Sequence, residues 1–168
     1  FGNLEKITRP ENHEGERMFF EYEYDGQVQT YVEKVKNAYG YESSSSYDYR
    51  FGQLLSSIDI NDQEIRYSID DKGRIETITG PYEIENNVPY TIRFEYHPET
   101  IIPWALTEHY DPQHPNNFIE TATFIDGFTR VLQIKKDGAI FTSSGQDDVE
   151  KIKMKSDPAT KKILDNLS

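Results

Sequence analysis

Residues 57–83 read SIDINDQEIRYSIDDKGRIETITGPYE, and this stretch decides the fold. In its centre, EIRYSI alternates polar with apolar residues, which is typical of a strand with one buried face. The strand runs into Asp70, and two polar residues later comes Gly73-Arg74. Glycine permits a positive φ at a bend, and the apolar residue after Arg74 starts another strand. The stretch therefore predicts a unit of strand, bend and strand.

Related units recur along the chain at irregular intervals. Tyr47-Asp48 followed by Phe51-Gly52 copies the quoted bend with one extra residue, and residues 1–10 parallel residues 72–81. A short carboxylate at the start of a bend can accept backbone amide hydrogen bonds, so a structural role explains the repeated aspartates better than a catalytic one. The bend residues assigned in this way are Gly2, Gly40, Asp48, Gly52, Asp70, Gly73, Arg74, Asp126 and Arg130, with Thr129 standing where another glycine is expected.

Such a unit cannot bury its apolar face alone, so neighbouring units have to cover it. The expected fold class is all-β, with a mostly antiparallel sheet. Hairpins are expected at Asp25-Gly26 and at Asp137-Gly138, and prolines bracket a short strand at residues 104–109. Residues 43–46 fit an exposed strand or a linker equally well. Weak helical spacing marks the tail from residue 158 to 167.

Composition and charge exclude several classes of partner and of reactive site. The net charge of −12 argues against nucleic acid and against insertion into anionic membranes, because both require basic side chains. No cysteine is present, so disulfides, thiolate nucleophiles and Cys-ligated metals are excluded. No apolar segment is long enough to span a membrane as a helix, and the N-terminus lacks the layout of a signal peptide.

The pairs Tyr47-Asp48, Phe51-Gly52, Ile69-Asp70, Gly73-Arg74 and Gly80-Pro81 resemble the tyrosine-aspartate, or Rhs, repeats. Residues 1–155 as a whole are similar to the Rhs region of the B-type components of bacterial insecticidal toxin complexes. That resemblance implies a spiralling β-sheet that forms a hollow shell around a toxic C-terminal segment. Residues 156–168 are expected to form a tail, either a short helix or the start of a truncated further repeat. Both ends of the chain interrupt a unit, which suggests a segment of a longer polypeptide.

The expected function is therefore non-catalytic, with no cofactor and no metal: a segment of a shell that encloses a C-terminal toxin or effector. Its partners would be the remaining repeats and the enclosed effector, and the parent protein would be secreted or associated with the cell envelope. Exposed sheet edges also predict self-association. The alternative is a carbohydrate-binding or cell-surface interaction module that holds a surface glycan on some of the 12 tyrosines.

Catalytic and metal sites compete with simpler explanations. His109, Asp111 and His114 could together hold a divalent metal, but a proline turn explains their spacing as well. An acidic loop with Asp147, Asp148 and Glu150 lacks the ligand pattern of a calcium loop. Glu42, Asp48 and Asp59 could supply a glycosidase pair, although chance pairing is expected with 30 acidic residues. The chain has no Gly-x-Ser-x-Gly elbow, phosphate loop or His-Glu-x-x-His motif.

Overall fold

The computed structural model describes residues 2–113, 118–141 and 149–152 of the chain. The chain is divided into two compact units: unit 1 covers residues 1–91, and unit 2 begins at Ile92. No helix in the described ranges is long and apolar enough to cross a membrane. The elements of unit 1 are β1 (Lys6–Glu11), β2 (Arg17–Tyr24), β3 (Val32–Asn37), β4 (Glu42–Asp48), β5 (Gln53–Ile58), β6 (Glu64–Ile69), β7 (Ile75–Thr79) and α1 (Pro81–Glu85).

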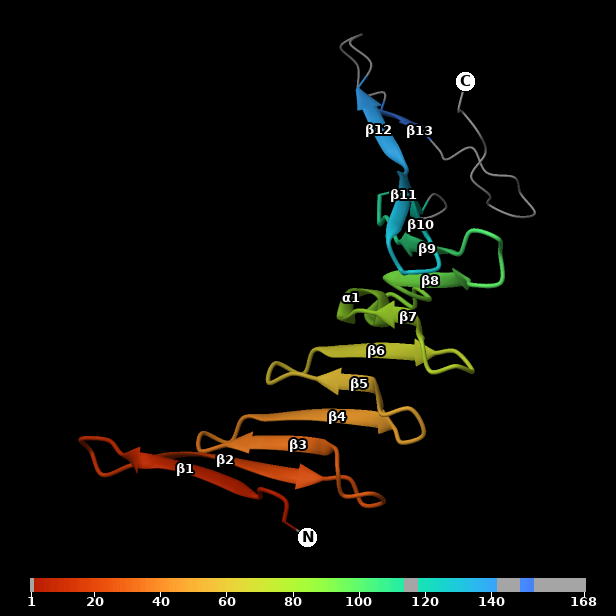
Figure 1. Cartoon of the computed structure of the whole chain (residues 1–168). Helices are drawn as coiled ribbons and strands as arrows, with labels where there is room; N and C mark the ends of the chain where they lie inside the picture. Colours follow the sequence, from red (N-terminus) through yellow and green to blue (C-terminus); the bar gives the residue numbers. More distant parts are fainter. Residues whose placement is uncertain (1, 114–117, 142–148, 153–168) are drawn as a thin grey trace. The chain divides into compact units, whose positions relative to one another are not determined.

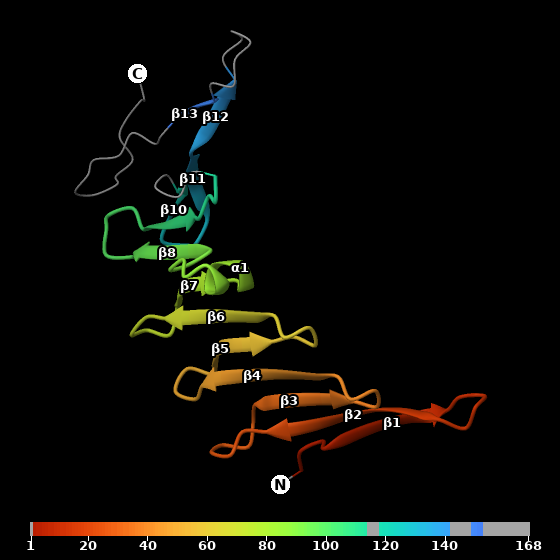
Figure 2. The same cartoon turned by 180° about the vertical axis from the view of Figure 1, so that it is seen from behind.

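Unit 1 is an antiparallel meander in which each strand pairs with its neighbours in the sequence. Figure 1 shows β1 to β7 as successive rungs, and Figure 2 shows the same rungs from behind. The connections β1/β2, β3/β4 and β5/β6 lie at one margin, on the left in Figure 1, and the connections β2/β3, β4/β5 and β6/β7 lie at the other. The strand-bend-strand unit of the sequence therefore appears as a hairpin that shares each strand with the next hairpin.

The two faces of unit 1 differ in chemistry because side chains alternate along a strand. One face, called here the charged face, carries a row of opposite charges across β1 to β4. Lys6 contacts Glu21 at 2.7 Å, Glu21 is the register partner of Lys36, and Lys36 contacts Glu42 at 2.8 Å. Their mutual hydrogen bond lowers the pKa of Glu42 and raises that of Lys36. The opposite face, called the apolar face, carries Phe20, Tyr22, Val35, Ile65, Tyr67 and Ile78.

Unit 2 contains the second meander, β8 (Ile92–His97), β9 (Trp104–His109), β10 (Ile119–Ile125) and β11 (Val131–Lys136), all paired antiparallel. Its core lies on one face of β9 and β10, where the buried cluster consists of Trp104, Leu106, Ala122 and Phe124. A separate antiparallel pair joins β12 (Gly138–Phe141) to β13 (Val149–Ile152). The all-β, mostly antiparallel class expected from the sequence is thus confirmed.

The local expectations met different outcomes. The strand predicted at residues 104–109 is confirmed as β9, and the serine run lies within β4. The hairpin predicted at Asp137-Gly138 is wrong, because β11 pairs with β10 and β12 pairs with β13. Buried Asp137 instead bonds back to β10: its amide donates to the carbonyl of Glu120 at 2.9 Å, and its Oδ2 accepts from the Glu120 amide at 3.2 Å. The tail predicted from residue 156 lies outside the described residues.

The first predicted hairpin forms, but its turn is longer than expected. β2 pairs with β3, so the chain does reverse after Asp25. However, β3 begins only at Val32, and the apolar and β-branched residues Val28 and Thr30 lie in the loop and not in the strand. The reason is the carboxylate of Asp25, which gathers the backbone amides of this loop, as described below.

Candidate functional site

The quoted bend at Asp70 shows how the repeated unit is built. The Asp70 amide donates to the Arg74 carbonyl at 2.8 Å, and the Gly73 amide donates to the Asp70 carbonyl at 3.0 Å. Asp70 Oδ1 accepts from the amides of Lys72 and Arg74 at 2.9 and 2.8 Å. Gly73 has a φ of +78°, the left-handed conformation that glycine adopts without strain. The bend is thus a hydrogen-bonded β-turn closed by a left-handed residue, with a carboxylate bracing it from inside.

The bend at Asp126 repeats this arrangement with threonine at the glycine position. Asp126 Oδ1 accepts from the amides of Phe128 and Arg130 at 2.8 and 3.0 Å, and the Asp126 amide donates to the Arg130 carbonyl at 2.9 Å. Thr129 has a φ of +61°, which is unusual for a β-branched residue. In both bends the arginine side chain turns back and forms an ion pair with the aspartate. The distance from Arg74 Nη2 to Asp70 Oδ2 is 2.6 Å, and that from Arg130 Nη2 to Asp126 Oδ2 is 2.7 Å. The bend therefore forms without glycine because the hydrogen bonds hold it.

Three further bends have the same hydrogen bonds, and two of them were missed in the sequence. Each begins with Asn or Asp, whose side-chain oxygen accepts the amides two and four residues later. The fourth residue has a positive φ each time: 80° at Gly15, 83° at Gly40 and 60° at Asp62. The sequence did not identify Asp62 as a residue that replaces glycine, although aspartate adopts the left-handed conformation more readily than most residues. These bends are residues 12–16, 37–41 and 59–63.

Two of the assigned bend residues differ from this pattern. At Asp48 the bend has one more residue: the Gly52 amide donates to the Asp48 carbonyl at 2.7 Å, Asp48 Oδ1 accepts from the Phe51 amide at 2.9 Å, and Gly52 has a φ of +68°. Gly2 is exposed and does not have a positive φ. The structure places it before β1 and outside any hairpin bend.

At one margin of unit 1, aromatic side chains cover the glycines of the next bend. A Cβ built on Gly73 would lie 2.5 Å from Cγ of Phe51, and one built on Gly52 would lie 2.6 Å from the hydroxyl of Tyr31. Nothing lies within 4 Å of a Cβ built on Gly40, at the opposite margin. Each aromatic ring thus belongs to the preceding connection and packs on the backbone of the following one. This contact joins successive hairpins within unit 1.

The same margin holds a cluster of tyrosines. The ring of Tyr31 stacks on Tyr47 with centroids 4.8 Å apart, and lies 5.9 Å from the ring of Tyr49. The hydroxyl of Tyr49 donates to Glu33 at 2.6 Å. This hydrogen bond raises the pKa of Tyr49 to about 12, because it holds the hydroxyl proton beside a carboxylate. The tyrosines here pack on one another, and do not form an open platform for a ligand.

Asp25 organises the β2/β3 connection. Its side chain is 1% exposed, and its two oxygens accept hydrogen bonds from five backbone amides. Burial raises its pKa, but the amide hydrogen bonds, with that of Tyr31 the largest, lower it by more and hold it far below its usual range. The loop is therefore built around an ionised, buried carboxylate. The amides come from Gln27, Val28, Gln29, Thr30 and Tyr31.

Ionised aspartates in the bends predict loss of stability in acid. The Arg130 side chain and amide lower the pKa of Asp126, and backbone amides lower that of Asp59. For Asp70 burial raises the pKa, but hydrogen bonds from Arg74 lower it by more. A folded-state pKa below the unfolded value of about 3.9 stabilises the fold fully above about pH 4, and this contribution is lost as the pH falls through the folded-state pKa. We expect the urea midpoint to fall between pH 5 and pH 2.

The control is Asp126→Asn, because Asn37 shows that an amide oxygen accepts the same two backbone amides. This variant is expected to lose only a little stability at pH 7, since the Arg130 side chain is exposed. Its midpoint should depend less steeply on pH, because one linked proton has been removed. Identical acid profiles for the two proteins would contradict the assignment of Asp126 as one of the titrating groups.

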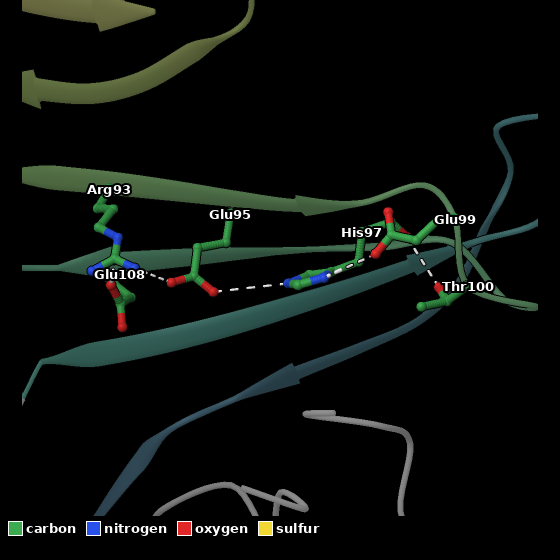
Figure 3. A network of polar contacts seen from close by, with 6 residues as sticks. All are labelled: Arg93, Glu95, His97, Glu99, Thr100 and Glu108. Atoms are coloured by element: carbon green, nitrogen blue, oxygen red, sulfur yellow. Dashed lines mark hydrogen bonds and ion pairs between the residues drawn. The ribbon is translucent and has the colours of Figure 1, made fainter. Parts of the chain in front are cut away.

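A polar network in unit 2 runs along β8 and into the following loop (Figure 3). Arg93 forms an ion pair with Glu95 and approaches Glu108 on β9 at 3.5 Å. His97 lies between two carboxylates, with Nε2 at 3.8 Å from Glu95 and Nδ1 at 3.4 Å from Glu99. The His97 ring also stacks on Trp104 at 4.0 Å. The network ties β8, β9 and the loop between them together.

The catalytic and metal candidates from the sequence lie in a local turn, on strands or outside the described residues. Asp111 Oδ1 accepts from the Gln113 amide at 3.0 Å, as in a local turn, and His109 is exposed at the end of β9. Glu42 and Asp48 occupy opposite ends of β4, about 20 Å apart at the rise of a strand. Within the described ranges, no three His, Cys, Asp or Glu side chains are placed to hold a metal. The residues outside them are His114, Asp147 and Asp148, together with the side chain of Glu150.

One hollow lies over β4 to β6, with a volume of about 300 Å³. Small serines line it where the rest of the apolar face carries larger side chains, and Pro81 of α1 adds to its wall. Ser45 and Ser57 are register partners on its floor, and Ile65 continues the floor onto β6. The hollow is therefore open, with serine hydroxyls and aliphatic groups on its wall and the carboxylate of Asp59 among the side chains that line it.

Known proteins resemble this chain in fold but not in sequence. The chain matches no protein-family model, and no curated protein is significantly similar to it. The crystal structure of TcdB2-TccC3 has a TM-score of 0.59 over 79% of this chain at 23% identity. TcdB2-TccC3-Cdc42 matches 79% of it, and TcdB2-TccC3 without its hypervariable C-terminal region matches 72%, both at 17% identity and a TM-score of 0.59. This chain spans 8% to 11% of those chains, and the likeness shows a shared fold.

Proposed function

We propose that this chain is a non-catalytic segment of the wall of a β-sheet shell, in a secreted protein like a toxin complex, and that the shell encloses a C-terminal toxin or effector. The observation that carries the proposal is the series of hairpins whose rings cover the glycines of the following bends. This contact occurs at two successive bends of unit 1, Tyr31 on Gly52 and Phe51 on Gly73, and it reinforces the hydrogen-bonded ladder that makes the sheet. The fold likeness to TcdB2-TccC3 supports the same conclusion.

The partners of such a segment are further repeats of the same polypeptide and the enclosed effector. Among the described strands, β1 and β11 each pair with a neighbouring strand on one side only. The apolar face of unit 1 is half-buried along β2, β3 and β6. Partly exposed apolar faces of this kind are typical of surfaces that another chain segment covers. An enclosed polypeptide with apolar side chains is the occupant that the proposal assigns to this face.

Protease protection tests the proposal in the longer polypeptide that contains this chain. The C-terminal segment should resist digestion as long as the sheet is intact, and should become sensitive in the Gly73→Ala variant, which weakens the wall. Gly40→Ala, which changes a glycine in open space, is the matched control and should retain protection. A C-terminal segment that is digested equally fast in all three proteins would overturn enclosure.

The second candidate is the carbohydrate-binding or cell-surface module. The observation that favours it is the serine-lined hollow, since its volume of about 300 Å³ is at the lower end for ligand pockets. Against it, the clustered tyrosines stack on each other. A glycan array separates the two functions: binding that is lost in Ser57→Phe would support the module, and absence of binding to any glycan would dispose of it.

A further inference from the structure

His97, the last residue of β8, lies between two carboxylates that belong to different segments (Figure 3). Its Nε2 is 3.8 Å from Glu95 on the same strand, and its Nδ1 is 3.4 Å from Glu99 in the connection formed by residues 98–103. The distance to Glu95 is too long for a hydrogen bond, and Nε2 is a buried atom with no hydrogen-bond partner within the described part of the chain. The ring therefore has an unused hydrogen-bonding position that faces a negative charge.

A neutral imidazole cannot donate to both carboxylates, because it carries one N–H and one lone pair. Whichever nitrogen lacks the proton turns its lone pair toward a carboxylate oxygen, which is an acceptor as well. The imidazolium ion has an N–H on both nitrogens, so it can form a charge-assisted contact with each carboxylate. Glu95 can accept through its Oε2, since its Oε1 is the oxygen that pairs with Arg93.

Polar contacts hold the connection of residues 98–103, because its apolar side chains contribute little packing. Ile101 is fully exposed and Ile102 is 41% exposed. The hydroxyl of Thr100 donates to the carbonyl of His97 at 3.0 Å. Glu99 is the one charged residue of the connection, and its contact with the His97 ring is the one through which a change of charge can act on the segment.

The neighbours of the ring across the sheet are aromatic. Its register partner on β9 is Trp104, whose ring stacks on it, and Phe124 on β10 follows. In the next bend, Asp126 and Arg130 pair with each other. Glu95 and Glu99 are therefore the charges of unit 2 that contact the imidazole. The other charged residues that the register places on this face lie farther along the strands, and they are Arg93 on β8, Glu108 on β9, Glu120 on β10 and Lys135 on β11.

We propose that His97 is a proton-operated latch on the connection of residues 98–103. The protonated ring bridges Glu95 on β8 and Glu99, and so holds the connection against the strand. In the neutral ring one of the two contacts loses its donor, and the connection is released. Histidine commonly changes its charge between about pH 5 and 8, so mildly acidic solution closes the latch. The proposal concerns unit 2 alone and does not depend on enclosure of an effector.

The fluorescence of Trp104 reports the charge of His97. It is the one tryptophan of the chain, and its ring stacks on His97 with centroids 4.0 Å apart. An imidazolium ion in this position quenches indole emission, so the emission should fall as the pH is lowered from about 8 to about 5.5. His97→Gln should abolish this fall, and His109→Gln, which changes an exposed histidine at the end of β9, should leave it unchanged. Emission that stays constant in the wild type would overturn the proposal.

Hydrogen exchange followed by NMR tests the latch itself. After correction for the intrinsic effect of pH on exchange, the amides of residues 99–102 should be protected about threefold more at the acidic end of this range, a modest change because Glu99 is 69% exposed. Glu99→Gln separates the latch from the titration of its ring. In this variant the fall in Trp104 emission should remain, while the protection should no longer depend on pH. Protection that is independent of pH in the wild type, or still dependent on pH in His97→Gln or Glu99→Gln, would refute the latch.

Discussion

Gly73→Ala is expected to lower the free energy of unfolding of unit 1 by about 2 to 4 kcal/mol, from two added costs. The first is the left-handed backbone, since Gly73 has a φ of +78°. The second is a collision: the new Cβ would lie 2.5 Å from Cγ and 2.9 Å from Cβ of Phe51. Phe51 cannot avoid it by turning its ring, because its own Cβ is involved. Urea unfolding followed by far-UV circular dichroism measures the change, since the one tryptophan lies in unit 2.

Gly40→Ala separates the two costs. Gly40 has a φ of +83° with nothing within 4 Å of its built Cβ, so this variant should lose only about 1 kcal/mol, the backbone cost. Combining Gly73→Ala with Phe51→Ala should be less damaging than the sum of the two single changes, because removing the ring relieves the contacts at 2.5 and 2.6 Å and leaves only the one with Cβ of residue 51 at 2.9 Å. Equal losses at Gly73 and Gly40, or full additivity with Phe51→Ala, would mean that the ring-on-glycine contact is not what joins the units.

Asp25→Ala is expected to be the most damaging change of a polar side chain. Five backbone amides would lose their acceptor at a site that is 1% exposed, and unsatisfied buried donors are costly. We expect the residues of the β2/β3 connection to lose protection from hydrogen exchange and the melting temperature to fall by about 10 °C. Tyr31 should then leave Gly52, because its backbone amide is held by Asp25 Oδ2. Hydrogen exchange and thermal unfolding measure these effects.

The matched control is Asp71→Ala, which removes an exposed carboxylate in the β6/β7 bend. Its melting temperature should stay within about 2 °C of the wild type, as for most surface changes. Asp25→Asn should fall in between, because one oxygen is retained while the amide group faces the donors of Thr30 and Tyr31. A melting temperature of Asp25→Ala equal to that of Asp71→Ala would show that water replaces the carboxylate without cost.

The fold class could be predicted from the sequence because alternation and bend residues agreed at the same places. β9 was predicted to the residue because prolines on both sides cannot join a ladder. The bends at residues 12–16 and 59–63 were missed because their signal is a hydrogen-bond pattern, and Asp62 fills the left-handed position without glycine. Short local motifs identify a bend only when the usual residue is present.

Contacts between residues far apart in the sequence could not be predicted from local patterns. Asp137-Gly138 has the composition of a tight hairpin, but Asp137 bonds to Glu120 on β10, and this partner is invisible in a local pattern. Likewise, Asp25-Gly26 suggested a two-residue turn, whereas the buried carboxylate collects five amides over seven residues. The packing of Phe51 on Gly73 was also beyond sequence reasoning, because it depends on which bends share a margin.

The pairing of each strand with its sequence neighbours has a kinetic consequence. Every ladder within each meander closes a short loop, so the contact order is low and little chain entropy is lost before the first pairings are rewarded. Such a chain can acquire structure progressively as it leaves a ribosome or a translocation pore, with each emerging hairpin templated by the one already formed. Assembly in the order of synthesis would allow a wall of this kind to grow without waiting for its distant parts.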